Sequence, residues 1–507
     1  MKKYSYLSIL LIAIITFFSC KKFLDQKPVS LITTDNAYTT AANIEAALNG
    51  AYSSFMGTNY YQWEFIQQSD MRSDNGYAGG SGDIDFLQLD LNTISNANGL
   101  VYRNWTELYA SIAKCNAVID NIENVTDPAL TDERRKQILG EASFLRAFHY
   151  YQLVKLWGGV PIEKHSNSTD PSVIRIARSA DTAVYNFINE DLQLAVNNLP
   201  DAYDGADAST NKVRATKGAA NALLAKIWAQ RPDRDYNKVL AYCNAVINSS
   251  AGYQLMDNYA DLFDGNHPYN QESILEIPYV QGTPQGCWGS ELFYPTHTGN
   301  NKVPSDAWQR YNVPSKTLVN AYVAAGDSIR ENANISFEVV PWSDENWNPC
   351  GKSDIKVPFD VKQKHPNNWN GGDHVYLLRL ADIITLKAEA QNELGNTADA
   401  ATTINIIRSR VHLKPLAATS QTQMRTAILN ERQLELAFEA QRWDDLKRYG
   451  VAVTVMNGLN EKKYTCNDGT PSNPIAINYN FSNETLLLPI PLLELQANPS
   501  LTQNPGY

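Results

Sequence analysis

Aromatic side chains in loop-like stretches are the residues of this chain best suited to binding chemistry. The 507-residue sequence holds 10 Trp and 27 Tyr. Many of them stand among Gly, Asn, Asp and Pro in residues 57–103 and 280–370, where no apolar periodicity explains them as helix core. Flat rings beside polar side chains suit the apolar faces and hydroxyl edges of sugar rings. In descending order, the candidate ligand-binding residues are Trp288, Trp308 and Tyr294, then Tyr77 and Asp83, then Trp342, Trp347 and Trp369. Packing of these rings as small surface clusters is the alternative.

Three glutamates are the first candidates for acid–base catalysis. Glu431, Glu435 and Glu439 follow one another at four-residue steps on one helical face. Like charges at this spacing repel unless nearby cations neutralise them. A row of carboxylates on one helix is more often an ion-paired structural face than a catalytic pair. We therefore predict ion pairing, and no enzyme activity. The nearby cations are Arg432, Arg442, Lys447 and Arg448.

Other catalytic patterns give no stronger candidate. The sequence contains no Gly-x-Ser-x-Gly elbow, His-Glu-x-x-His motif or phosphate-binding loop. Arg146 and His149 lie on one predicted helix, and we interpret them as a buried ion-paired arginine and a packed histidine. A helical glycoside hydrolase remains a less favoured alternative, because it would need two carboxylates at a suitable separation.

Cysteines and acidic pairs give no metal or redox motif. No Cys-x-x-Cys spacing occurs, so we expect no metal and no cofactor. Asp83 and Asp85 could contribute to a calcium loop, but the remaining oxygen ligands of such a loop are missing. Cys115 and Cys243 lie on helical patterns and are expected to be small buried packing residues. A bridge between Cys287 and Cys350 is possible in an oxidising compartment, and the sequence leaves it open.

Helix pairs are expected to position the loops. From Leu377 to Leu394 apolar residues return at three- and four-residue steps, Gly395 ends that pattern, and a second helix is expected at 398–411. The short turn makes the two helices antiparallel. This pair resembles a tetratricopeptide unit, which needs further pairs to bury its faces. We expect a mainly α fold with a helical scaffold at 40–250 and 375–450, and a loop-rich insertion with minor β structure at about 250–375.

The net charge and the amino-terminal segment restrict the partners and the location expected for this protein. A net charge of -11, with no long basic run, argues against nucleic acid as a partner. Lys2 and Lys3 precede an apolar run that is too short to span a bilayer, so residues 1–19 are predicted to be a signal peptide. Ser19 before Cys20 resembles a lipobox, which would make Cys20 the lipidated first residue of a tether at 20–39. Ordinary cleavage and secretion is the alternative.

Several motifs together resemble one family. ERQLELAFEAQRWDDLKRYG (431–450) is similar to the carboxyl-terminal signature of the SusD/RagB family of outer-membrane nutrient-binding lipoproteins. YLLRLADIITLKAEAQNELGN (376–396) resembles the helix that precedes it, and the closing Pro-Ile-Pro and Gln-Asn-Pro-Gly-Tyr motifs also match. FLRAFHYYQLVKLWGGVP (144–161) and KKFLDQKP (21–28) extend the resemblance over most of the chain.

The resemblance implies a function without covalent chemistry. SusD-like proteins are lipid-anchored at the outer membrane, face the exterior, and capture an oligosaccharide or polysaccharide for a SusC-like TonB-dependent transporter. The family also implies an aromatic ligand site in the loops of residues 40–507, whereas its individual binding residues vary too much to transfer. The runner-up ligand is peptide, as for RagB-like members. The number of Trp residues favours sugar.

Overall fold

The computed structural model describes most of the chain beyond the amino-terminal segment. The predicted signal peptide, Cys20 and most of the predicted tether lie outside the described residues. Within the described part, no helix is both long enough and apolar enough to cross a membrane. The described residues are 38–63, 69–79, 83–166, 175–289, 311–339, 344, 346–351, 354–362 and 370–507.

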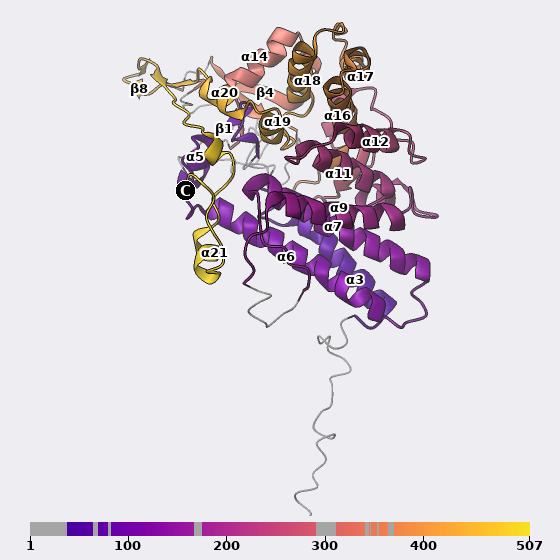
Figure 1. Cartoon of the computed structure of the whole chain (residues 1–507). Helices are drawn as coiled ribbons and strands as arrows, with labels where there is room; N and C mark the ends of the chain where they lie inside the picture. Colours follow the sequence, from indigo (N-terminus) through magenta and orange to yellow (C-terminus); the bar gives the residue numbers. More distant parts are fainter. Residues whose placement is uncertain are drawn as a thin grey trace, which may run out of the picture.

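Long helices form the amino-terminal part of the scaffold. α7 starts where the Thr131 hydroxyl accepts a hydrogen bond from the Arg134 amide, as a helix cap does. It packs against α6 on one side and α9 on another, and α3 lies beside α6 and α7 (Figure 1). The elements are α3 (Ala41–Tyr52), η1 (Ser53–Met56), α5 (Ile84–Asp90), α6 (Gly99–Asn121), η2 (Ile122–Asn124), α7 (Asp132–Trp157) and α9 (Asp181–Asn198). Because α5 and the start of α6 fall inside residues 57–103, the interpretation of this stretch as loop-like was wrong for those two segments.

Two helix pairs build the right-hand side of the scaffold in Figure 1. α11 packs on α12, α16 packs on α17, and α12 contacts α16, so segments far apart in sequence form one helical layer. Gly395 adopts φ +87° in the turn after α16, which a residue with a Cβ atom rarely tolerates. The predicted mainly α fold and this antiparallel pair are confirmed. The elements are α10 (Ala208–Val213), α11 (Lys217–Gln230), α12 (Tyr236–Ile247), α16 (Leu380–Glu393) and α17 (Thr397–Arg410).

A short antiparallel ladder replaces the expected start of the carboxyl-terminal helix. β2 (Ser273–Ile277) pairs with β6 (Val375–Arg379), and both Leu377 and Leu378 are buried. Burial of successive residues is typical of a strand covered on both faces. Leu377 also fits the helical spacing of the residues after it, so periodicity alone placed it in the helix. The helix α16 begins only at Leu380.

The insertion holds more regular structure than expected. α14 and α15 precede the β4–β5 ladder, and β1 pairs with β3, which attaches residues 76–77 to the insertion. The Ser315 hydroxyl accepts from the Leu318 amide and so caps α14. The elements are β1 (Gly76–Tyr77), η3 (Tyr259–Phe263), β3 (Val313–Pro314), α14 (Lys316–Ala325), α15 (Ser328–Asn334), β4 (Ile335–Val339) and β5 (Lys356–Asp360).

The carboxyl-terminal segment crosses back over the scaffold and ends beside α7. The Asn504 side chain donates hydrogen bonds to the carbonyl oxygens of Trp157 (3.0 Å) and Leu488 (2.7 Å), and the Trp157 indole donates to Pro489 (3.0 Å). The closing motifs therefore satisfy carbonyl groups at the end of α7. The elements are α18 (Gln421–Glu435), α19 (Arg442–Arg448), α20 (Ala452–Asn457), β7 (Lys462–Lys463), β8 (Cys466–Asn467), β9 (Thr470–Pro471), β10 (Ile475–Ala476), η4 (Asn483–Thr485) and α21 (Leu492–Ala497).

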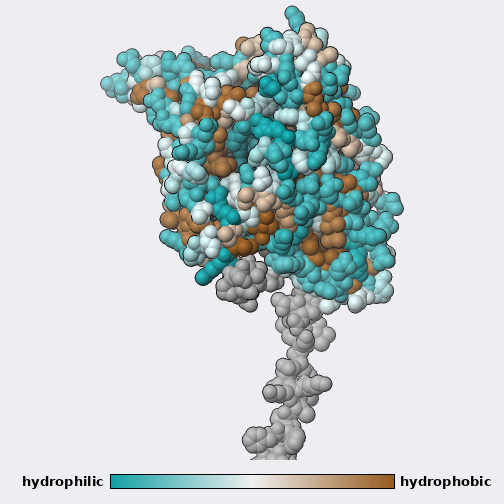
Figure 2. All heavy atoms as spheres, in the orientation of Figure 1, coloured by the Kyte–Doolittle hydropathy of each residue, from teal (hydrophilic) through white to brown (hydrophobic). Residues whose placement is uncertain are grey.

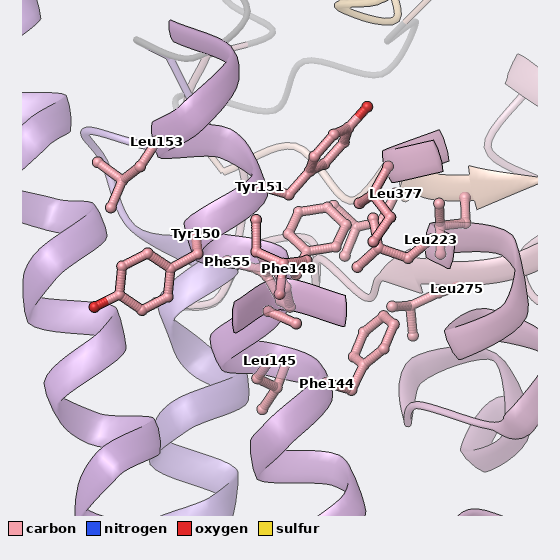
Figure 3. Close-up of a cluster of buried hydrophobic side chains, with 14 of the residues drawn as sticks. Phe55, Phe144, Leu145, Phe148, Tyr150, Tyr151, Leu153, Leu223, Leu275 and Leu377 are labelled. Carbon is pink, nitrogen blue, oxygen red and sulfur yellow. The ribbon is translucent and has the colours of Figure 1, made fainter. Parts of the chain in front are cut away.

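The main core lies between the long helices and the β2–β6 ladder. Phe55, Phe148 and Leu377 point toward one another in this core, whereas Tyr150 points to the opposite side of α7 (Figure 3). The rings of Phe55 and Phe148 meet edge to face with centroids 5.2 Å apart. This core fixes the ladder, and with it the segments on both sides of the insertion, to the scaffold.

Buried ion pairs join the insertion to the scaffold. Glu431, Glu435 and Glu439 are ion-paired as predicted, although α18 ends at Glu435. The predicted cations were wrong. The three glutamates instead pair with cations from other segments of the chain, which are Arg330, Lys362, Arg379, Arg408 and Arg410. The four cations named from the sequence instead pair with Asp74, Asp382, Glu389, Asp444 and Asp445.

The structural interpretations of Arg146 and His149, and of Cys115 and Cys243, are confirmed, whereas the possible disulfide is not. Arg146 lies 2.7 Å from Asp191, and the fully buried His149 ring lies 3.1 Å from the Tyr60 hydroxyl. Cys115 and Cys243 are buried and free. The possible Cys287–Cys350 bridge is contradicted, because Cys350 is bonded to Cys466 instead. Sequence spacing could not reveal this pairing across the fold.

Candidate ligand-binding site

Four aromatic rings from separate segments form a cluster where the loops meet. Trp63 lies 5.3 Å from Trp288, 4.8 Å from Tyr311 and 5.3 Å from Phe86, measured between ring centroids. Tyr311 and Phe86 are 4.3 Å apart. We call Trp63, Phe86, Trp288 and Tyr311 the aromatic cluster. Its rings come from the chain after η1, from α5, from the turn before residue 290 and from the chain before β3.

Close backbone packing sets the position of Trp288. Its amide donates to the Gln62 side-chain oxygen (3.2 Å), and a Cβ atom on Gly289 would overlap the Gln62 carbonyl oxygen. The preceding Cys287 exchanges two backbone hydrogen bonds of 2.8 Å with Gly371. Trp288 is therefore held against Trp63 on one side and against the chain that leads into β6 on the other.

Burial distinguishes the members of the cluster. Trp63 and Tyr311 are each 7% exposed and Phe86 is 4% exposed, whereas Trp288 is only partly buried. The exposed Asp83 caps α5 by accepting from the Asp85 amide (3.0 Å). Burial, followed by the charge of Asp83, raises the pKa of Tyr311 to about 12, so its hydroxyl stays protonated at neutral pH. The cluster thus presents one ring to solvent, with a carboxylate at its edge and rigid rings behind it.

The other predicted site residues lie in different surroundings. Tyr77 is buried in β1 and donates to the Asp344 carboxylate at 3.3 Å. Trp347 is partly buried and packs edge to face on Phe337, with centroids 6.0 Å apart. Asp85 accepts from the Gly99 amide (3.0 Å), so the Asp83 and Asp85 carboxylates both bind backbone amides. Trp308, Tyr294, Trp342 and Trp369 lie outside the described residues.

A pocket opens between the end of β5, the start of β6 and the chain after α18, and its lining was not foreseen from the sequence. Its cavity volume is about 60 Å³, and a second hollow shares Phe263, Lys362, His374 and Tyr376 with it. The Tyr376 hydroxyl donates to the Leu262 carbonyl oxygen (2.9 Å), which fixes that ring. We call the first hollow the inner pocket. Its lining residues are Tyr61, Phe263, Asp360, Lys362, His374, Val375, Tyr376, Phe438, Glu439 and Ala440.

Sequence reasoning missed most of these side chains for an identifiable reason. Trp63 and Tyr311 stand in the aromatic loop-like stretches, but no local pattern shows that they meet Trp288. Asp360 is the last residue of β5, and Lys362 lies two residues beyond it. Nothing in the local sequence distinguishes them from residues at the end of any other strand. The aromatic content of these stretches was the signal available, and it does not tell a ring that faces a ligand from one that supports it.

The family can be identified at this point. Residues 344–507 match the model of the SusD family, and residues 22–228 match a family described as starch-binding and associating with the outer membrane. A SusD-like protein of Formosa agariphila is 27% identical, over 97% of this chain and 98% of the relative. The starch-binding protein SusD of Bacteroides thetaiotaomicron is 24% identical, over 80% of this chain and 78% of the relative. The chain belongs to the SusD/RagB family.

Solved structures agree on the fold. A laminarin-binding SusD-like protein superposes with a TM-score of 0.73 at 24% identity, covering 93% of this chain and all of that protein. The surface glycan-binding protein A of Bacteroides fluxus gives a TM-score of 0.74 at 24% identity, with 92% and 100% coverage. At this level of identity the likeness establishes a SusD-like fold.

Proposed function

We propose that the protein binds an oligosaccharide at the outer membrane and delivers it to a SusC-like TonB-dependent transporter. The observation that carries this proposal is the partly exposed Trp288 ring, which is backed by the packed ring of Trp63, in a cluster whose Tyr311 lies near the exposed carboxylate of Asp83. A flat ring and a hydrogen-bonding carboxylate are the complementary groups for a sugar. Relatives named for binding starch, laminarin and surface glycans support the same class of ligand.

Rigid support explains why a single exposed ring can contribute substantially. The Trp288 backbone is held by its amide hydrogen bond and by the backbone hydrogen bonds between Cys287 and Gly371, and its ring packs on Trp63. Little side-chain freedom therefore remains to be lost on binding. Removal of such an anchor typically costs roughly 1–3 kcal/mol of binding free energy. The face of the molecule shown in Figure 2 is largely hydrophilic, with apolar residues in scattered groups. No covalent step is needed for capture and release.

The ligand class is tested by calorimetry on the chain without residues 1–20, a deletion that removes no described residue. A panel of soluble glycans and a panel of peptides are titrated at matched concentrations. We expect heat from one class of glycan, weakened in Trp288→Ala and retained in Trp288→Phe, which keeps a stackable ring. Weakening in Trp308→Ala would extend the site to that residue. Heat from peptides alone would overturn the sugar assignment and favour a RagB-like peptide carrier.

Membrane attachment is a separate part of the proposal. The Ser19–Cys20 junction after an apolar run supports lipidation of Cys20, and a lipid chain attaches a protein without a spanning helix. In cells, Cys20→Ala should shift the protein from the outer-membrane fraction to the soluble fraction, and the mature wild-type protein should begin at an acylated Cys20. An unmodified amino terminus, or membrane retention of Cys20→Ala, would refute the anchor.

Delivery to a transporter is tested by co-purification from outer membranes. A tagged chain should bring down a TonB-dependent barrel protein in a fixed ratio, and this association should be equal in Trp288→Ala. A tagged chain that purifies without such a barrel after gentle solubilisation would refute the delivery step while leaving glycan capture intact.

A further inference from the structure

A larger cavity opens between the amino-terminal helices and the β2–β6 ladder. Its volume is about 470 Å³, which is typical of sites that hold small molecules. Phe55 of η1, Leu275 of β2 and Leu377 of β6 line it, and all three belong to the main core (Figure 3). We call this cavity the β2 pocket. It shares no lining residue with the aromatic cluster or with the inner pocket.

Apolar and aromatic side chains form most of the walls of the β2 pocket. Tyr52 and Phe55 come from α3 and η1, and Tyr269 comes from the chain before β2. The Tyr269 ring meets the His374 ring edge to face, with centroids 4.8 Å apart. Its backbone φ of +57° is uncommon for a residue with a Cβ atom. Because aromatic rings pack favourably on one another, these walls suit a ligand with a flat apolar ring.

The charged groups that line the pocket already have partners in the protein. Arg214 lies 2.9 Å from the buried Glu141 and 3.5 Å from Glu45. The Glu276 carboxylate lies 2.8 Å from the His374 ring nitrogen. An anionic ligand would meet Glu276 without an unshared cation, and a cationic ligand would compete with His374. The pocket therefore favours an uncharged ligand.

One oxygen of Glu276 remains without a donor. Its Oε1 accepts from the Tyr269 amide (2.8 Å) and contacts His374, whereas its Oε2 is buried and has no hydrogen-bond partner among the described residues. Buried polar atoms in native proteins are nearly always hydrogen-bonded, and an unsatisfied one is destabilising. A ligand with one O–H donor would satisfy this atom.

We propose that the β2 pocket binds an uncharged phenolic compound, whose ring lies against the aromatic and apolar walls while its hydroxyl donates to Glu276 Oε2. This inference goes beyond the proposed glycan binding and does not depend on it. An oligosaccharide would bring many hydroxyl groups, and most of them would face apolar walls without partners. A ring without a hydroxyl would leave Oε2 unpaired.

Equilibrium dialysis of the chain without residues 1–20 compares methyl ferulate, an uncharged phenol, with its phenolic methyl ether. The measurement is made at about pH 6.5, where a phenol stays protonated. The wild type should bind methyl ferulate at least about tenfold more tightly, because the ether cannot donate a hydrogen bond. Glu276→Gln keeps an oxygen for the Tyr269 amide but places an NH₂ group at the Oε2 position, so it should abolish this preference.

A blocking variant keeps the test decisive even if Glu276→Gln folds poorly. Val213 lines the pocket from α10 and is only partly buried, so Val213→Trp should fill the pocket and abolish methyl ferulate binding. Ala208→Trp, an exposed change on the same helix outside the lining, is the matched control and should retain it.

Three results would overturn this inference: no binding of methyl ferulate by the wild type, equal affinity for the phenol and its ether, or undiminished binding by folded Val213→Trp. A phenol preference that persists in folded Glu276→Gln would overturn the assigned contact with Oε2 and with it the proposed ligand class. Val213→Trp should leave glycan binding unchanged, because Val213 lies outside the aromatic cluster. The two proposals therefore fail separately.

Discussion

Replacing Glu435 by Gln should cost much more stability than its conservative chemistry suggests. Glu435 is fully buried, and its carboxylate lies 3.0 Å from Arg330, 2.7 Å from Arg379 and also in contact with Arg410. Arg330 belongs to α15 of the insertion, Arg379 to β6 and Glu435 to α18. The change removes one negative charge shared by three guanidinium groups, and these groups remain buried.

The expected loss in free energy of unfolding is about 3–5 kcal/mol, the usual cost of breaking a buried pair from one side. Burial alone would raise the pKa of Glu435, but Arg410, Arg379 and Arg330 outweigh it and hold that pKa well below its usual range. A depressed carboxyl pKa contributes stability above the ordinary value of about 4.5, and this contribution is lost as the pH falls. The difference between wild type and variant should therefore be full at neutral pH and shrink in acid.

Urea unfolding followed by tryptophan fluorescence measures this loss, with Glu393→Gln as the matched control. Glu393 pairs with Arg425 on the surface, where the Arg425 side chain is 36% exposed, and such pairs contribute about 0–1 kcal/mol. Equal losses in the two variants at neutral pH would refute the claim that the buried network fastens the insertion to the scaffold. A Glu435→Gln effect that does not depend on pH would refute the electrostatic explanation.

Two further predictions concern the interior and the cysteines. Burial raises the pKa of Asp70 to about 8, so the folded chain retains a proton that the unfolded chain releases above about pH 4. Relative to Asp70→Asn, the free energy of unfolding of the wild type should therefore fall by up to about 1.4 kcal/mol per pH unit between about pH 4 and 8. Thermal or urea unfolding measures this difference, and parallel stability curves for the two proteins would contradict the assignment. Non-reducing peptide mapping should join Cys350 to Cys466 and leave Cys287 open to alkylation after unfolding, whereas a Cys287–Cys350 peptide would show that the described pairing is wrong.

The helical scaffold was predictable because its information is local. Apolar spacing, caps such as Thr131 and punctuating residues such as Gly395 act within a few positions. Leu377 shows the limit of this reasoning. Its spacing continues a helical pattern, but pairing of β6 with residues about a hundred positions earlier makes it part of a strand. Tertiary contacts override a local pattern when the two compete.

The site was predictable in character but not in composition. The aromatic loops are the basis for proposing a ligand surface, and Trp288 and Trp347 are described candidates that are only partly buried. Tyr77 and Trp347 belong to the same stretches, yet they are packed against Asp344 and Phe337. Asp360 and Lys362 carry no sequence signal at all, because their place in the inner pocket depends on contacts between distant segments of the chain.

The central claim is tested most directly by the dissociation constant of the best glycan for wild type, Trp288→Phe and Trp288→Ala, measured by calorimetry at one pH. The account predicts that Trp288→Ala weakens binding by about 5- to 150-fold, which corresponds to roughly 1–3 kcal/mol, and that Trp288→Phe retains most of the affinity. Unchanged affinity in folded Trp288→Ala would contradict the proposed site, and the absence of any glycan ligand would contradict the proposed function.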